Sequence, residues 1–222
     1  MRTLLVGRKL LQTKLRDVEL SMRGILRGFG LKVGEVSKGR FAARIKELIC
    51  GHAMLETVIG AMLIAREGLH AEFMRLHKRM LALARADAVS HRLMTAPGVG
   101  ALVAIGSEPQ WTTRRGSANP KPLARTFRAD PKKYQSGETD VTGGISKLGD
   151  AMVRTALYEA ANAMLSRPIR FSALKRWAMQ VAKRRGLKRA KVALARKLAA
   201  VLHRMWVDGT EFHWGKEVLP AA

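Results

Sequence analysis

Cysteine is nearly absent from this sequence, and so is any long apolar run. Cys50 is the single cysteine, which excludes an intrachain disulfide and a thiolate metal cluster. The longest apolar run, residues 57–65, is too short to cross a bilayer, and no signal-peptide pattern opens the chain. We therefore expect a cytoplasmic protein with no membrane partner, in which Cys50 is a small buried hydrophobic residue.

Acidic residues are also scarce, since 17 Asp and Glu stand against 41 Lys and Arg in 222 residues. The resulting net charge of +24 exceeds what solubility requires and indicates a polyanionic partner. Hydrophobic residues make up 47% of the chain, enough for a core of ordinary size, which argues against disorder throughout.

The first 88 residues show apolar side chains at helical spacing. One stripe runs from Leu4 to Phe29, a short helical pattern covers residues 38–49, and a second long stripe follows. The second stripe consists of Leu55, Val58, Met62, Ala65, Leu69, Phe73, Leu76, Met80 and Leu83. Its steps of three and four predict long helices of coiled-coil type, which pair within one chain or between the chains of a homo-oligomer. The alternative is the ordinary core of a helical bundle.

A break at residues 97–100 separates this region from the rest of the chain. Residues 105–130 are rich in Gly, Pro, Ser, Thr and Arg without a sustained period, which predicts a loop or disordered insert. Helical patterns return at 149–165, 171–185 and 189–207, with Gly186 between the last two. The predicted fold is mainly α, with a helical region at 1–88 and a DNA-binding C-terminal domain at 89–222.

The strongest electrostatic signal lies between Arg170 and Arg204, where 12 Lys and Arg occur without an Asp or Glu. Apolar residues recur within the same stretch, so one face can pack while the other meets phosphates. The DNA-binding candidates are Lys183, Arg184, Arg185, Lys188, Arg189 and Lys191. A solvated basic face without a partner is the alternative.

Two further patterns could carry chemistry. Residues 93–104 predict a helix, a glycine hairpin and a helix, in which Gly98 and Gly100 let the backbone approach a phosphate; an ordinary helix connection uses the same residues. Ser136 is a hydroxyl in a predicted flexible turn, with Lys132, Lys133 and Lys147 near in sequence. A serine that attacks a phosphodiester needs such cations, although most Ser-Gly pairs are simply turns.

Several motifs in a fixed order resemble the insertion sequence 110 (116/902) transposase family. They are PGVG at 97–100, PKKYQSG at 131–137, GISKLGD at 144–150, RxxLYEAA at 154–161, and KVALARKLA to MWxDGT at 191–210. KLRDVE at 14–19 and LRGFGLKVGE at 26–35 resemble the linker helices of the same family. The resemblance covers nearly the whole chain.

The resemblance implies an enzyme that cuts and rejoins DNA strands of a mobile element, in studied forms with a guide RNA. It implies an N-terminal RuvC-like domain with four metal-binding acidic residues, a helical linker, and a C-terminal domain with a catalytic serine. Ser136 matches that serine, and Ser146 is the second choice. We expect this chain to lack the acidic domain, to bind no metal itself, to need Mg²⁺ only together with that domain, and to be inactive alone.

The sequence departs from the family at residues 105–130, where the family has a D-P-x-R-F-x-x-S pattern. Back-translated with GC-rich codons and read from the third letter of codon 110, this stretch can encode a segment that contains DPARFRKS. Two compensating frameshifts would explain the departure, and a true insertion is the alternative. The competing functional interpretation is a non-catalytic basic protein that coats DNA or RNA.

Overall fold

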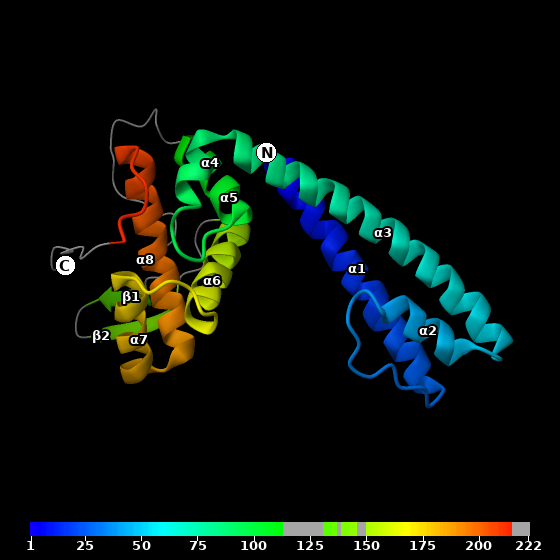
Figure 1. Ribbon diagram of the computed structural model, residues 1–222. Coiled ribbons are helices and arrows are strands. Elements are labelled where there is room, and N and C mark those ends of the chain that lie inside the picture. Colours follow the sequence, from blue (N-terminus) through cyan, green and yellow to red (C-terminus); the bar gives the residue numbers. More distant parts are fainter. Residues whose placement is uncertain (113–130, 137–138, 146–149, 215–222) are drawn as a thin grey trace. The chain divides into compact units, whose positions relative to one another are not determined.

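The computed structural model describes residues 1–112, 131–136, 139–145 and 150–214, and for 108–112 and the two strands it gives the backbone alone (Figure 1). The described chain is mainly helical, as the sequence predicts. It divides into two compact units, Arg2–Met80 and Leu81–Ala222, with Met1 grouped with the second. The division falls inside a helix, eight residues before the boundary that we expect at 88.

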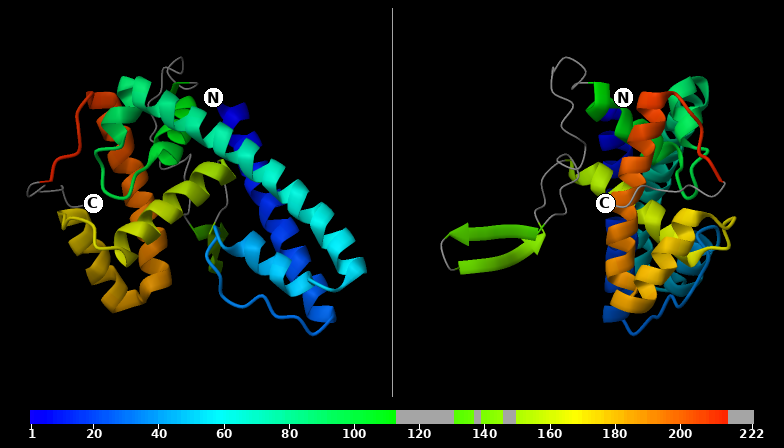
Figure 2. Two further views of the ribbon diagram at one scale, coloured as in Figure 1. Left: turned by 45° about the vertical axis from the view of Figure 1, so that its right-hand side comes forward. Right: turned by 90° about the vertical axis from the view of Figure 1, so that its left-hand side faces the viewer.

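The N-terminal unit is built from α1 (Arg2–Gly28), α2 (Phe41–Ile49) and α3 (Ala53–Ala86, whose last residues belong to the other unit). The helices α1 and α3 lie side by side in both views (Figures 1 and 2). Their contacts join Glu19 to Arg66 and Arg8 to His77, so the residue numbers increase along one helix as they decrease along the other. The two long helices therefore pair antiparallel within one chain.

The core of this unit lies where α2 covers both long helices. It contains Met22, Leu26, Val33, Phe41, Ile45, Ile49, Leu55, Ile59 and Leu63. The predicted stripe holds only in part at the start of α3: Leu55 is buried as expected, but Val58 and Ala65 are exposed while Ile59 and Leu63 are buried. A heptad pattern assumes one partner helix, whereas this part of α3 faces two, and its buried face is shifted accordingly.

A charged pair crosses the same core. The guanidinium of Arg66 donates from Nε and Nη2 to Oε1 of Glu19, both over 2.8 Å, and lies 4.9 Å from the ring centroid of Phe41. The side chain of Arg66 is 9% exposed and that of Glu19 is 25% exposed. Because a buried cation is costly without its partner, this pair favours one alignment of α1 against α3.

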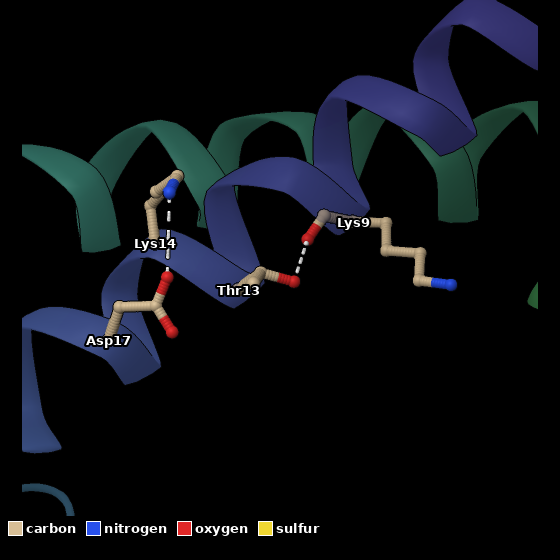
Figure 3. Close-up of polar contacts among 4 residues, drawn as sticks. All are labelled: Lys9, Thr13, Lys14 and Asp17. Atoms are coloured by element: carbon tan, nitrogen blue, oxygen red, sulfur yellow. Dashed lines mark hydrogen bonds and ion pairs between the residues drawn. The ribbon is translucent and has the colours of Figure 1, made fainter.

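The outer surface of α1 contains weaker contacts (Figure 3). Thr13 donates to the carbonyl oxygen of Lys9 over 3.0 Å, and Lys14 pairs with Asp17 at 3.5 Å with both side chains more than half exposed. Exposed pairs of this kind contribute little stability. Cys50 is exposed rather than buried, because it follows Ile49, the last buried residue of α2, in the turn toward α3.

The C-terminal unit contains five helices among its described residues: α4 (Ala88–Leu93), α5 (Ala101–Thr112), α6 (Ala151–Ser166), α7 (Ala173–Arg185) and α8 (Leu187–Asp208). The three helices predicted after residue 149 are confirmed nearly to the residue. The helix α8 packs against α4, α6 and α7, and α6 also packs against α5. Their shared core includes Leu157, Ala161, Met164, Leu194, Leu198 and Leu202.

Two expectations for this unit need correction. Helix α5 continues to Thr112 with Ile105 and Ser107 fully buried, so residues 105–112 are not irregular; residues 113–130 lie outside the described part. The sequence also predicted a flexible turn around Ser136, whereas β1 (Pro131–Ser136) and β2 (Thr139–Ile145) form an antiparallel hairpin. The signal was the run Lys133 to Val141, whose β-formers flank a central glycine.

Candidate nucleic-acid interface

Five exposed cations of the predicted basic stretch meet where α7 ends and α8 begins. They are Lys183, Arg184 and Arg185 in the last turn of α7, and Lys188 and Arg189 in the first turn of α8. Gly186 between them has a φ of 81°, which glycine adopts readily because it lacks a Cβ. This turn brings two helix ends together, and we call the five residues the α7–α8 cluster.

Buried apolar residues hold both helices behind the cluster. The hydroxyl of Ser172 accepts a hydrogen bond from the Lys175 N–H over 3.2 Å and caps α7, whose Leu174 and Ala178 are buried. Along α8 the buried positions include Ala190, Leu194, Leu198 and Leu202, four residues apart on one face. The cluster is therefore presented by a packed helix pair rather than by a loop.

The helix macrodipoles stabilise three of the five cations in the α7–α8 cluster but not the other two. Cations in the last turn of α7 face the negative end of its macrodipole, and each contributes about 0.3–1 kcal/mol of stability. Lys188 and Arg189 stand at the positive end of α8, where the same effect is unfavourable. No side chain caps α8, whereas Asp87, Asp150 and Ser172 cap α4, α6 and α7. The two charges and the uncapped N–H groups of α8 together favour a bound anion.

The cluster has no internal counter-charge. Within the part of the chain that the structure describes, none of its five side chains forms an ion pair or hydrogen bond. Further along α8, by contrast, Arg204 pairs with Asp208 at 3.2 Å. The ammonium of Lys197 lies 4.2 Å from the ring centroid of Trp177 and links α8 to α7, while Lys191 is half-buried. The five cations of the α7–α8 cluster are therefore accessible to the phosphate groups of a partner.

The glycine turn at 97–100 packs against α6. Gly98 has a φ of 77°, and a Cβ at this position would lie 2.7 Å from the carbonyl oxygen of Ala160. Gly98 is therefore required for close packing on the small residue pair Ala160 and Ala161, which the sequence reasoning did not anticipate. Gly100 is exposed with open space around it, and its carbonyl oxygen accepts the first hydrogen bonds of α5.

Ser136 is the last residue of β1, and its Cα pairs with that of Thr139 at the first residue of β2. It therefore lies in the hairpin ladder beside the turn rather than in a flexible turn, since the backbone pairing extends to this residue. Lys132 and Lys133 precede it in β1, with Lys133 opposite Thr142. Lys147 and Ser146 lie outside the described residues.

The described residues form neither a metal-ligand set nor a membrane-spanning helix. In residues 1–112, 131–136, 139–145 and 150–214, no three His, Cys, Asp or Glu side chains gather where they could hold a metal ion. The described residues therefore offer no ligand set that fits Mg²⁺. No helix in the same part of the chain is long and apolar enough to cross a membrane.

The pKa of each of two histidines lies below its ordinary value. Burial lowers the pKa of His77, and the neighbouring Arg8 charge lowers it further. Nε of Arg8 donates to Nδ1 of His77 over 3.2 Å, a bond that requires the unprotonated ring nitrogen. Burial also lowers the pKa of His203, which stacks on Trp206, with a smaller opposing effect from Asp208.

Comparison with known proteins places this chain among the transposases. A model of the family "Transposase IS116/IS110/IS902" matches residues 90–176. The transposase for insertion sequence element IS1111A of Coxiella burnetii is 28% identical over 191 residues, which cover 82% of this chain and 51% of that protein. A probable family 20 transposase of Pseudomonas aeruginosa is 27% identical over 187 residues, 82% of this chain and 55% of its own length.

Residues 90–176 match the IS116/IS110/IS902 transposase family, and the chain is similar to these curated transposases, of whose length it spans about half. Several motif residues that carry the resemblance build the fold. Leu157, Ala160 and Ala161 of the RxxLYEAA motif are buried. Gly209 of the MWxDGT motif ends α8 with a φ of 70°, and Thr210 donates to the Met205 carbonyl oxygen over 3.2 Å. These residues of the two motifs therefore have structural roles in the fold.

Proposed function

We propose that this chain is the DNA-binding part of a transposase and that the α7–α8 cluster contacts the phosphates of duplex DNA. The observation that carries the proposal is the placement of Lys188 and Arg189. These cations stand at an uncapped helix N-terminus where they do not favour the fold. Beside them are three further cations that form no ion pair with any residue that the structure describes. Phosphate contacts require positive charge within short reach and no base-reading geometry, so we expect binding that depends little on sequence.

We further propose Ser136 as the nucleophile of strand cleavage and rejoining. Its Oγ would form a bond to phosphorus as the bond from phosphorus to a deoxyribose oxygen breaks. The hydroxyl proton would pass to a base, and the departing oxygen would take up a proton. Support comes from the family resemblance of residues 131–137 and from two lysines in the same strand, Lys132 and Lys133. Lys147 is proposed to assist from beyond β2.

The glycine turn contributes differently at its two glycines. We propose Gly100, which is exposed before α5, as the point where backbone approaches a phosphate in the manner of a helix-hairpin-helix, with Gly98 securing the turn on α6. A guide RNA of the element and a second copy of the chain are further partners that the family resemblance suggests.

DNA binding is tested with a fluorescent 20-bp duplex and the full chain. Replacing the five residues of the α7–α8 cluster with Gln should remove most binding. A variant with five other exposed cations replaced, K9Q/R16Q/K78Q/R79Q/R85Q, makes the same charge change with the same numbers of Lys and Arg. Equal binding by the two variants would mean that the overall charge alone determines the DNA affinity, and the α7–α8 cluster would no longer be the proposed binding site.

Catalysis is tested in a strand-transfer assay that adds a separately prepared RuvC-like domain, guide RNA and Mg²⁺. The chain alone should not cut DNA, because a serine hydroxyl is a weak nucleophile without an activating partner. With the added components, a version with residues 110–127 restored to the shifted reading frame should act, and Ser136→Ala should abolish that activity. Activity retained in Ser136→Ala would move the nucleophile elsewhere, with Ser146 tested next.

A further inference from the structure

A second group of exposed cations lies in the N-terminal unit, between the end of α1 and the start of α2. Residues 27–40 contain four basic residues and one acid, Glu35. The four are Arg27, Lys32, Lys38 and Arg40, all exposed, and their side chains form no ion pair or hydrogen bond with any residue that the structure describes. We call these four cations and Phe29 the α1–α2 tip.

The segment that carries the tip is fixed on the helices. Arg23 donates from Nη1 to the carbonyl oxygen of Gly34 over 2.9 Å, and its guanidinium lies 5.2 Å from the Phe41 ring centroid. Val33 is buried in the core with Leu26 and Phe41. Figure 1 shows this segment looping beside the end of α1 and α2. The tip therefore presents its charges on a folded surface.

Phe29 is exposed because of how α1 ends. Gly30 has a φ of 75°; its N–H donates to the Arg27 carbonyl over 3.0 Å, and the Leu31 N–H donates to the Leu26 carbonyl over 2.9 Å. These two bonds define a Schellman motif, in which the residue after the glycine supplies the apolar contact. Leu31 packs on the core accordingly, and Phe29 remains 60% exposed. The fold thus leaves a large aromatic side chain in solvent among cations.

The start of α2 resembles the start of α8. Arg40 occupies the N-cap of α2 and provides no side-chain hydrogen bond to the first turn. Lys38 and Arg40 therefore stand at the positive end of a helix, as Lys188 and Arg189 do, where an anion is favoured and a cation is not. Helix stability therefore does not explain these charges, and this helix end favours an anion.

We propose that the α1–α2 tip binds single-stranded nucleic acid, with its cations on successive phosphates and one unpaired base stacked on Phe29. Groups of cations with an exposed aromatic ring suit single strands, because every base has a face that stacks on an aromatic side chain. A duplex offers phosphates to the same cations but keeps its bases stacked on each other. Unpaired DNA at a cut site and unpaired RNA share this chemistry.

The test uses the full chain in the background of the cluster variant, K183Q/R184Q/R185Q/K188Q/R189Q, so that binding at the two surfaces is separated. The tip variant is R27Q/K32Q/K38Q/R40Q. Its control is K9Q/R16Q/K78Q/R79Q, which also replaces two Lys and two Arg that are exposed. Figure 3 shows Lys9 extended from α1 without a dashed contact at its ammonium, whereas Lys14 pairs with Asp17 and is left unchanged.

Stacking is tested by changing Phe29 alone. Phe29→Leu keeps an apolar side chain without a π face, and Phe29→Trp keeps the π face. Probes are a 20-nucleotide single-stranded DNA, the RNA of equal length, and a 20-bp duplex, each read by anisotropy. Phe29→Leu should weaken single-strand binding roughly five- to 150-fold, as expected for one stacked base, and duplex binding less than twofold. Phe29→Trp should bind as the parent does.

Location is tested independently by UV cross-linking of a 5-iododeoxyuridine or 4-thiouridine strand, with the peptide containing Phe29 as the expected adduct. The comparison of DNA with RNA identifies which single strand the tip prefers. The proposal is overturned if the tip variant loses no more single-strand affinity than its control, if Phe29→Leu and Phe29→Trp bind alike, or if duplex binding falls equally. Failure of the DNA-binding proposal would show separately, as full duplex binding by the cluster variant.

Discussion

Removing the charge of the α7–α8 cluster should change the salt dependence of DNA binding more than the stability of the fold. The substitution K183Q/R184Q/R185Q/K188Q/R189Q leaves helix propensity nearly unchanged, since Gln is close to Lys and Arg on that scale. Three of these cations favour the α7 end and two oppose the α8 start, at about 0.3–1 kcal/mol each, so the effects largely cancel. The free energy of unfolding should fall by no more than about 1 kcal/mol.

The expected effect on binding is much larger. Each phosphate contact contributes about 0.9 to the slope of log affinity against log salt, so five contacts contribute about 4.5. Between 50 and 200 mM salt, those contacts alone account for a fall of about 500-fold in the affinity of the parent chain. The variant should lose this part of the slope, while the matched variant with Lys9, Arg16, Lys78, Arg79 and Arg85 replaced should keep most of it.

The assay is anisotropy of a labelled 20-bp duplex at four or more salt concentrations, with circular dichroism of each variant to confirm helicity. Three sequences of equal length should bind alike, because phosphates carry no sequence information. A parent-chain affinity that does not change with salt, or slopes that fall equally in both variants, would refute the claim that the position of the α7–α8 cluster makes it the DNA-binding surface.

The remaining predictions concern the fold and the gene. Gly98→Ala should destabilise the C-terminal unit by at least about 1–3 kcal/mol in chemical denaturation, because Gly98 has a positive φ and a Cβ there would collide with the carbonyl oxygen of Ala160. Gly100→Ala should leave the stability nearly unchanged. Equal losses of stability in the two variants would remove the packing explanation. Glu19→Ala should lower the free energy of unfolding by on the order of 3 kcal/mol, because it leaves Arg66 without its partner. The double substitution Glu19→Leu with Arg66→Met should recover most of this loss. An unchanged stability of Glu19→Ala would show that the pair does not fix the alignment of α1 against α3. Because the pKa of His77 is lowered in the folded protein, the unfolded chain takes up a proton at this residue first as the pH falls. The melting temperature should therefore be highest above about pH 7 and decline toward pH 5. His77→Gln should reduce that decline, and an unchanged decline would contradict the assignment. Sequencing the gene should reveal a D-P-x-R-F-like segment in the shifted frame after codon 110, and its absence would leave a true insertion.

The helices could be predicted because apolar period and glycine position carry that information locally. The three C-terminal helices follow from the spacing of residues such as Leu194, Leu198 and Leu202 and from the break at Gly186. Their end at Asp208 follows from the glycine after it, which takes the left-handed conformation that ends α8. Local signals of this kind need no knowledge of the partner elements.

What could not be predicted depends on contacts between distant residues. The shifted face of α3 exists because α2 also covers it, and no heptad count contains that fact. Ile105 and Ser107 are buried in a stretch whose composition suggests a loop, since α5 packs against α6.

The candidate site divides in the same way. The basic residues of the α7–α8 cluster were identifiable from the absence of acids. The contrast between the end of α7 and the start of α8 needed the structure, which places Gly186 between the two helices and shows no side-chain cap on α8. Gly98 was assigned to phosphate binding because a glycine near a helix start suits that role. Its contact with Ala160, 62 positions later in the chain, gives a packing reason that the pattern alone could not supply.

The most direct test of the α7–α8 interface is lysine acetylation of the full chain, read by mass spectrometry with and without a saturating 20-bp duplex. All lysines of the comparison are exposed in the free protein, so any protection reports the bound DNA. The account predicts that Lys183 and Lys188 become strongly protected while Lys9 and Lys78 stay reactive. Equal protection of all four lysines, or protection of Lys9 and Lys78 alone, would contradict it.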